Sequence, residues 1–160
     1  LKAEGLDGNT IFIFTSDHGE TMCSHGLQDP KNSPYRESVN TPFIARWPKG
    51  IKPHIGDWML SSPDIMPTLL GLCGLGDRIP ESVQGRDLSA LLMAPEKASE
   101  RPSDALYLQY LDGETDAQGL VLNAFPSARG IITERYTMAI YIDRDYRVSG
   151  TLLFDNLEDP

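Results

Sequence analysis

The first apolar stretch of the chain is an unbroken run rather than an alternation of apolar and polar residues. Residues 10–15, "TIFIFT", are rich in β-branched and aromatic side chains and are followed at once by the polar segment "SDHGE". Such a run is typical of a strand buried on both faces in a parallel sheet. Ligands bind beyond the carboxyl ends of strands in such sheets, so the polar segment stands where a site is expected. A second short strand is expected in "TPFIARWP", residues 41–48.

Helical spacing begins at residue 61, in "SSPDIMPTLLGLCGLG". Ser62 is a candidate N-cap, with Pro63 at the first helical position and Asp64 in the first turn, where a carboxylate is favoured. The residues expected on the apolar, buried face are Ile65, Leu69, Leu72 and Cys73. A shorter helix is expected around residues 87–93.

From residue 105 onward the pattern favours strands divided by turns. The β-prone runs "ALYLQYL", "ARGIITERYTMAIYID" and "GTLLFD" predict a small antiparallel sheet, with a tight turn at "TERY". The loop at residues 113–127 is long enough to be functional, for example by bordering a pocket, and the default interpretation is a mobile surface loop.

The Pro- and charge-rich segment "APEKASERPSD" separates the helical region from these runs. We therefore expect an α/β fragment, more exactly described as α+β, in two parts. Residues 1–97 would hold the last strands of an α/β sheet, and residues 98–160 a small antiparallel sheet with a packed helix.

Composition narrows the classes of function. The 160 residues include 14 Lys and Arg against 23 Asp and Glu, which gives a formal charge of −9. Nucleic-acid binding needs a basic surface, so no nucleic acid is expected as a partner. No apolar run approaches the roughly 20 residues that span a bilayer, so no membrane partner is expected either. The chain starts without Met or a signal-peptide pattern, and we expect it to be part of a longer protein.

Residues suited to binding a metal or an anion follow the first run. Asp17 offers hard oxygen ligands for Ca²⁺ or Mg²⁺, and His18 offers a ring nitrogen. Neighbouring residues point to opposite sides of a strand, so both reach one ion only where the strand has ended, which Gly19 favours. His25 and Lys31 follow, and a lysine can hold an anionic oxygen. The set suits a metal-bound sulfate or phosphate ester.

A simpler interpretation gives these residues no site. An Asp-His-Gly sequence after a strand can be a turn in which Asp17 bonds nearby backbone amides, and a lysine in a loop is usually a solvated charge. Two ligands also fall short of the about six to eight oxygens of a Ca²⁺ site or the about four ligands of Zn²⁺. The residues alone leave both interpretations open.

Several segments, taken in order, resemble the later part of the sulfatase family, within the alkaline phosphatase superfamily. They are "IFIFTSDHGE", "SHGL", "YRESVNTPFIARWPKGI", "SSPDIMPTLLGLCGL", "VQGRDLSALL", "ARGIITERYTMAIY" and "LLFDNLEDP". The resemblance implies the C-terminal portion of an arylsulfatase-like enzyme, with the last part of an alkaline-phosphatase-like sheet. It implies a sulfuric ester hydrolase acting on a sulfated small molecule or glycan, and, by analogy, a periplasmic or secreted parent protein.

The resemblance also assigns roles to the residues after the first strand. Asp17 and His18 match two ligands of the family's divalent cation, usually Ca²⁺. Lys31 matches the lysine that contacts the sulfate group, and His25 matches the histidine near the leaving-group oxygen, a candidate proton donor. Lys31 lies six residues after His25, where many relatives have five, so a residue has been inserted before it.

The nucleophile of the family is missing from the sequence. Sulfatases convert a Cys or Ser in C/S-x-P-x-R to formylglycine, and an early Asp pair completes their metal site; neither pattern occurs here. Cys23 and Cys73 lack the Pro and Arg at the required offsets, which removes Cys23 as a nucleophile. We therefore expect formylglycine in a missing N-terminal part, and a piece that is inactive alone and binds metal weakly.

Other interpretations remain open at this point. A phosphodiesterase or phosphonate monoester hydrolase of the same superfamily would use the same Asp-His pair, whereas a non-catalytic carbohydrate-binding module would use the antiparallel part. Arg36 and Glu37 either support the site from behind or form a surface ion pair. A strand at residues 10–15 without its neighbours invites pairing with another chain, so an oligomer is a further expectation.

Overall fold

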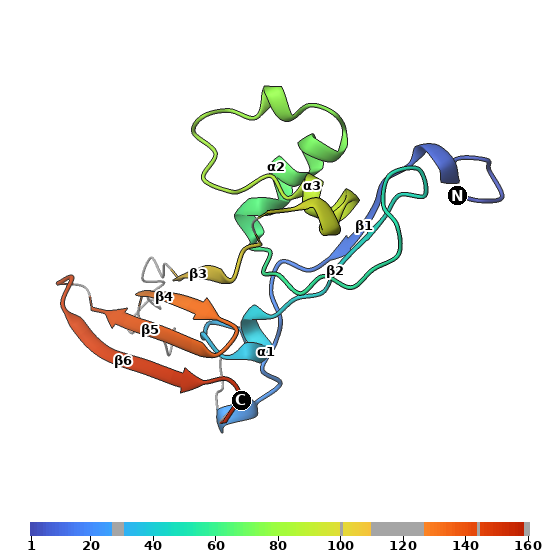
Figure 1. Ribbon diagram of the computed structural model, residues 1–160. Coiled ribbons are helices and arrows are strands. Elements are labelled where there is room, and N and C mark those ends of the chain that lie inside the picture. The colour runs from blue at the N-terminus through green and yellow to red at the C-terminus, as the bar shows by residue number, and fades with distance from the viewer. Residues whose placement is uncertain (27–30, 100, 110–126, 144, 159–160) are drawn as a thin grey trace, which may run out of the picture. The chain divides into compact units, whose positions relative to one another are not determined.

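The computed structural model describes residues 1–26, 31–99, 101–109, 127–143 and 145–158. They form two compact units, each built from two stretches of the chain. Unit 1 contains residues 1–16 and 42–103, and unit 2 contains residues 17–41 and 104–160. Among the described strands, unit 1 holds a two-stranded sheet and unit 2 a four-stranded sheet (Figure 1). The predicted domain boundary between residues 97 and 98 stays a prediction.

The sheet of unit 1 is antiparallel. β1 (Phe12–Thr15) pairs with β2 (Phe43–Arg46), and the two lie side by side in Figure 1. The two predicted strands are thus confirmed, whereas the parallel pairing expected for the first is not found among the described strands. Burial on both faces is also wrong for the described structure, because Phe12 and Phe14 are 46% and 53% exposed.

The two faces of this sheet differ, because side chains alternate along a strand. Phe43 and Ala45 of β2 line an open cavity of about 380 Å³, whose walls also include Trp58 and Leu92. The phenylalanines of β1 lie on the opposite face and are exposed. The side chains of the unbroken apolar run therefore divide between two faces of the sheet. One face packs within unit 1, and the described residues leave the other face exposed.

Both predicted helices of unit 1 are present, as α2 (Ser62–Leu72) and α3 (Ser89–Met93). The N-cap of α2 is Ser61 rather than Ser62, one residue earlier than expected. The Ser61 amide donates to the Asp64 carboxylate at 3.0 Å, which is one half of a capping box. Asp64, expected in the first turn of this helix, therefore lies there and takes part in the cap.

The buried face of α2 differs from the predicted one. Asp64, Thr68 and Leu72, spaced by four residues, are buried, whereas Cys73 is exposed. The prediction of a buried Cys73 is therefore wrong. It assumed an apolar buried face, but the helix turns two polar side chains inward to meet the loop that precedes α3.

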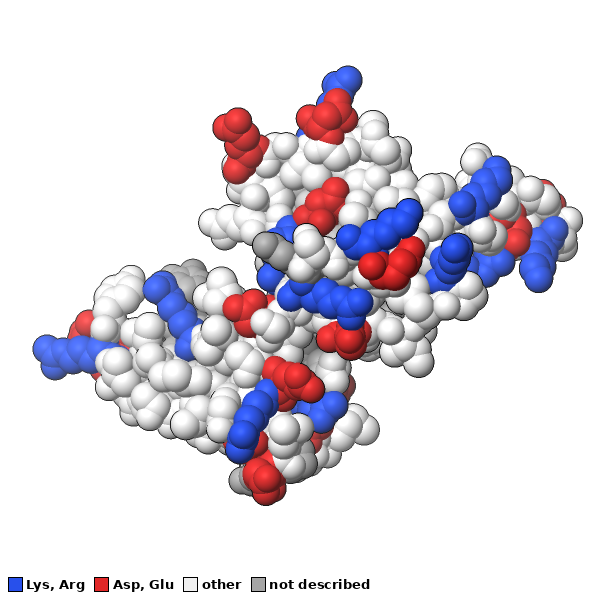
Figure 2. All heavy atoms as spheres, in the orientation of Figure 1, with Lys and Arg blue, Asp and Glu red and all other residues white. Residues whose placement is uncertain are grey.

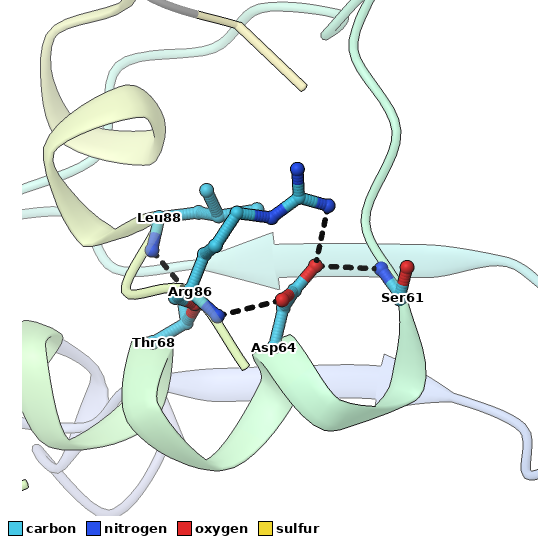
Figure 3. Close-up of polar contacts among 5 residues, drawn as sticks. All are labelled: Ser61, Asp64, Thr68, Arg86 and Leu88. Atoms are coloured by element: carbon cyan, nitrogen blue, oxygen red, sulfur yellow. Dashed lines mark hydrogen bonds and ion pairs between the residues drawn. The ribbon is translucent and has the colours of Figure 1, made fainter. Parts of the chain in front are cut away.

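These polar side chains and their partners form what we call the Asp64 clasp, made of Ser61, Asp64, Thr68, Arg86 and Leu88 (Figure 3). Besides the Ser61 amide, the Asp64 carboxylate accepts the Arg86 amide at 2.7 Å and its guanidinium at 3.4 Å. Thr68 Oγ1 accepts the Leu88 amide at 3.0 Å. Asp64 is only 2% exposed, and a buried carboxylate is tolerated when hydrogen bonds use its lone pairs. The clasp thus fixes the loop before α3 onto α2.

Unit 2 contains the predicted antiparallel sheet. Its strands, in spatial order, are β3 (Asp104–Gln109), β4 (Ser127–Thr133), β5 (Tyr136–Ile142) and β6 (Val148–Asp155). The tight turn between β4 and β5 is confirmed, and the Tyr136 amide donates to Thr133 Oγ1 at 2.8 Å. Ala128 and Ala139 are buried, so the centre of the sheet provides the packed part of this unit. The short helix α1 (Arg36–Val39) belongs to the same unit.

The remaining elements are short. In the described parts of the chain, 3₁₀ helices lie at Asp7–Asn9, Ser24–Gly26, Gly76–Arg78 and Pro95–Lys97. No helix within the described residues is long and apolar enough to cross a membrane. Figure 2 shows acidic and basic side chains interspersed over the face drawn, rather than separated by sign. The predicted loop at 113–127 lies outside the described residues except for its last position.

Candidate functional site

The first part of the candidate site is the pair formed by Asp17 and His18, just beyond the end of β1 in the sequence. Asp17 Oδ2 lies 3.5 Å from His18 Nε2, and Asp17 Oδ1 accepts the His18 amide at 3.0 Å. His18 Nδ1 lies 2.7 Å from the Gly19 carbonyl oxygen, so in the neutral ring Nδ1 donates and Nε2 keeps the lone pair. A carboxylate oxygen and a ring nitrogen, two atom types that can bind a metal ion, therefore lie close together at an exposed position.

The backbone beside this pair is held by α1. The Gly19 amide donates to the Ser38 carbonyl oxygen at 2.7 Å, and a Cβ at position 19 would overlap the Glu37 carbonyl oxygen. Ser38 is buried and accepts the Ser33 hydroxyl at 3.2 Å. Only glycine allows this close approach, which explains the glycine that the sequence places directly after the Asp-His pair.

The second part of the site is what we call the His25 cluster, made of His25, Tyr35 and Glu37. The His25 ring stacks on the Tyr35 ring with centroids 3.8 Å apart and planes 10° apart. Its Nε2 lies 3.3 Å from Oε1 and 3.4 Å from Oε2 of Glu37. An ionised carboxylate only accepts hydrogen bonds, so Nε2 carries the proton in this contact.

Tyr35 connects the His25 cluster to the sheet of unit 2. Its ring lies 5.1 Å from that of Phe154 in β6. Tyr141 of β5 is buried, and burial, with a smaller effect of nearby Tyr35, raises the pKa of its phenol to about 12. The phenol of Tyr141 is therefore neutral at physiological pH.

The four predicted site residues all fall in unit 2. Lys31 is exposed, and residues 27–30, which lead to it, lie outside the described part of the chain. Within the described residues, His25 contacts Glu37 and Tyr35 rather than the Asp17–His18 pair. The structure therefore places Asp17 and His18 in one group and His25 in another, each held by the segment that contains α1.

Comparison with known proteins narrows the interpretations that the sequence left open. A sequence model of the family described as Sulfatase matches residues 1–75. Over the whole chain, the sequence is 58% identical to an endo-4-O-sulfatase of Bacteroides thetaiotaomicron, of which it covers 32%. The chain belongs to the sulfatase family.

Two further relatives agree with this assignment. An ulvan-active sulfatase of Formosa agariphila is 33% identical over the whole chain, which covers 29% of that protein. A solved structure, described under the metabolism of multiple glycosaminoglycans by Bacteroides thetaiotaomicron, matches 100% of the chain and 33% of its own length. Its TM-score is 0.87 at 59% identity. The chain spans about a third of the length of the sulfatases it matches.

The donors present fit one side of the divalent-cation site that the sulfatase family implies. Asp17 has carboxylate oxygens that could bind a cation, and the contact of His18 Nδ1 with the Gly19 carbonyl makes Nε2 the ring nitrogen that could do so. A backbone acceptor on the second ring nitrogen is common for metal-binding histidines. In the part of the chain that the structure describes, no cluster of three or more His, Cys, Asp or Glu could hold an ion. The pair alone would therefore be an incomplete ligand set for a cation.

Sequence reasoning named Glu37 as a support but missed its partner and the aromatic stack. The segment "YRES" contains both residues that contact His25, because Tyr35 precedes α1 and Glu37 lies within it. The link to His25 was hidden by the backbone of residues 22–26, where Met22, Cys23 and His25 have positive φ. Cys23 is an exposed free thiol, and it remains outside the nucleophile motif of sulfatases.

Proposed function

We propose that this chain forms part of a sulfatase that hydrolyses sulfate esters. Asp17 and His18 are two ligands of a divalent cation, most simply Ca²⁺, and Lys31 binds the sulfate group. His25 protonates the oxygen that leaves when the ester bond breaks. The 58% identity with an endo-4-O-sulfatase carries the proposal, because the similarity extends over the whole chain and therefore over the region that contains these four residues.

The proposed substrate is a sulfated glycan. The most similar relatives reported above are named for 4-O-sulfate and ulvan, and the matching structure is described under glycosaminoglycan metabolism. At 58% identity over the whole chain, the endo-4-O-sulfatase is the better guide than the ulvan-active enzyme at 33%. We therefore assign a 4-O-sulfated glycosaminoglycan as the substrate of the longer protein.

The roles follow from the chemistry of each side chain. A cation held by Asp17 and His18 would offset negative charge on the sulfate oxygens as the sulfuryl group is transferred. The Lys31 ammonium is a compact positive charge that acts on the same oxygens. A sugar alkoxide is a poor leaving group, so His25 donates a proton to it as the S–O bond breaks.

The attacking group comes from outside these residues. The C/S-x-P-x-R motif is not in the sequence, and the relatives are about three times as long as the matched chain. In the proposal, formylglycine and the remaining metal ligands belong to the rest of the longer protein. Residues 1–160 then supply half of the metal site, the sulfate lysine and the proton donor.

The test uses the full-length protein that contains these residues, assayed on a 4-O-sulfated glycosaminoglycan oligosaccharide. We expect release of sulfate that is lost with EDTA and restored by Ca²⁺. Asp17→Asn should lower kcat/KM by at least about 100-fold, because the cation loses a charged ligand. Asp77→Asn is the matched control, since Asp77 is an exposed aspartate of unit 1 whose ion pair with Arg78 is open to solvent.

Three results would contradict the proposal. Hydrolysis of phosphate diesters or phosphonate monoesters in preference to sulfate esters would assign the protein to another branch of the superfamily. Glycan binding without hydrolysis and unchanged by EDTA would indicate a carbohydrate-binding module. Full activity of the Asp17→Asn variant would remove this residue from the metal site.

A further inference from the structure

The His25 ring is held at two points within unit 2. Glu37 contacts its Nε2 through both carboxylate oxygens, at 3.3 and 3.4 Å. Tyr35 supports one face, with the ring planes 10° apart. The His25 side chain is nevertheless 32% exposed, so the ring is fixed in orientation while part of it remains accessible to a ligand.

The backbone around His25 would not hold this position by itself. Met22, Cys23 and His25 have φ values of 52°, 68° and 58°, a region that costs non-glycine residues about 1 kcal/mol or more each. Such conformations persist where surrounding contacts determine them. Thr21 is one such anchor, because it is 1% exposed and its carbonyl accepts the Ser24 amide at 2.8 Å. The contacts of the His25 ring are the other.

Glu37 occupies a central position between the two parts of the site. Its carbonyl oxygen lies against Gly19, next to the Asp17–His18 pair, and its carboxylate reaches His25. Its side chain is 42% exposed, and α1 carries it with Ser38 buried beside it. A single turn of helix therefore sets where both parts of the site lie within unit 2.

We propose that Glu37 is a positioning residue for His25, which it holds on the Tyr35 ring so that Nδ1 faces the leaving oxygen of the substrate. This inference rests on the proposed function, because it needs His25 to be the proton donor. It differs from a plain surface ion pair in giving the two ring nitrogens separate tasks. Nε2 keeps its proton for the carboxylate, and Nδ1 exchanges its proton with the substrate.

The step balances as follows. In the longer protein, formylglycine would supply the anionic oxygen that accepts the sulfuryl group as the S–O bond to the sugar breaks. The bonding electrons go to the sugar oxygen, which takes the proton from Nδ1 of the His25 imidazolium. His25 becomes neutral with its remaining proton on Nε2, where Glu37 accepts it. A carboxylate that orients an imidazole in this way fixes the ring tautomer and stabilises its cationic form.

Leaving-group dependence tests the proposal in the full-length protein. The substrates are a 4-O-sulfated oligosaccharide, whose alkoxide needs a proton, and 4-nitrophenyl sulfate, whose phenolate does not. Glu37→Ala should lower kcat on the sugar sulfate by about 10- to 100-fold, with KM changed less than threefold and little loss on the aryl sulfate. His25→Ala should show the same selectivity with a larger loss, about 10²- to 10⁴-fold.

Two further variants define the role of the carboxylate. Glu37→Gln keeps the shape and one acceptor but loses the charge, so its kcat should fall between those of the wild type and Glu37→Ala. The double variant lacking both His25 and Glu37 should be no slower than His25→Ala. Glu134→Ala, at the exposed turn between β4 and β5, is the matched control and should leave both substrates unaffected. An equal loss on both substrates after Glu37→Ala, or no loss on either, would overturn the inference.

A readout independent of activity separates this inference from the proposed function. Nitrogen-15 spectra of the histidine rings, assigned with His25→Gln, should show neutral His25 with its proton on Nε2. Glu37→Ala should produce a mixture of both tautomers. A protein inactive on every sulfate ester would refute the proposed function, while the spectra would still test how Glu37 holds the ring. A proton on Nδ1 in the wild type, or spectra unchanged by Glu37→Ala, would overturn the positioning role.

Discussion

The Asp64 clasp and the His25 cluster follow the same plan in two different units. In each, a carboxylate on a helix holds a residue from another segment of the chain, 22 positions away for Asp64 and 12 for Glu37. Asp64 is buried, and its contacts include the amides of Ser61 and Arg86 at 3.0 and 2.7 Å. Glu37 is partly exposed, and its contacts with His25 are 3.3 and 3.4 Å.

The difference concerns how the oxygens of each carboxylate are used. Those of Asp64 are committed to neighbours of fixed position, so this residue can contribute to stability but not bind a ligand. The Glu37 carboxylate and the His25 ring are both accessible to water, where an ion pair contributes little to stability. The same pairing of an acid with its partner thus contributes to stability when it is buried, whereas the exposed pair keeps its polar atoms accessible to solvent.

The largest effect on the free energy of unfolding is expected when Asp64, the buried carboxylate, is replaced. Asp64→Ala leaves the part-buried amides of Ser61 and Arg86 without their acceptor, and each unpaired amide that is shielded from water costs about 1–3 kcal/mol. We therefore expect the free energy of unfolding to fall by about 3 kcal/mol or more in urea titrations. The control is Asp77→Asn, which should change it by less than about 0.5 kcal/mol. Equal effects of the two variants would show that the clasp does not stabilise the fold.

A smaller effect is expected from the other half of the clasp. Thr68 is 0% exposed, and Thr68→Val keeps its shape while removing the acceptor of the Leu88 amide. The free energy of unfolding should fall by about 1–2 kcal/mol. Because both residues hold the same loop, the double variant with Asp64→Ala should lose less than the sum of the two single losses. Strict additivity would contradict a shared role.

The smallest effect on stability is expected when Glu37, the exposed carboxylate, is replaced. Glu37→Ala should lower the free energy of unfolding by less than about 1 kcal/mol, because its partner His25 is also accessible to water. The measurement is a urea titration under the conditions used for Asp64→Ala. A loss as large as that of Asp64→Ala would mean that Glu37 is a structural residue, and the comparison would fail.

The sequence predicted the C-terminal sheet well because its information is local. The turn between β4 and β5 and the β-prone runs on either side of it indicate antiparallel strands. It predicted the existence of β1 but not its environment, because burial of Phe12 and Phe14 depends on which segments cover them. The antiparallel pairing with β2 joins residues about 30 positions apart, and no local pattern specifies it.

The limits were similar at the two carboxylate groups. In the sequence, a place in the first turn of a helix was enough to explain Asp64. No residue near it indicated that Arg86 would bind the same carboxylate. The candidate residues Asp17, His18, His25 and Lys31 came from residue chemistry and family resemblance, and their roles stay predictions. The contact of His25 with Glu37 needed the left-handed backbone of residues 22–26, which non-glycine residues rarely adopt and which no turn signal indicated.

The hydrogen bond from Gly19 to Ser38 has a consequence for how this segment can evolve. It joins the two ends of the stretch between them, so the stretch behaves as a closed loop with fixed ends. Doubling the length of such a loop costs only about 0.6 kcal/mol in entropy. All the residues between His25 and Tyr35, including Lys31 and those that precede it, lie within this stretch of the sequence. Insertions there can change the exposed surface of this segment while Asp17 and His18 keep the backbone anchor beside them.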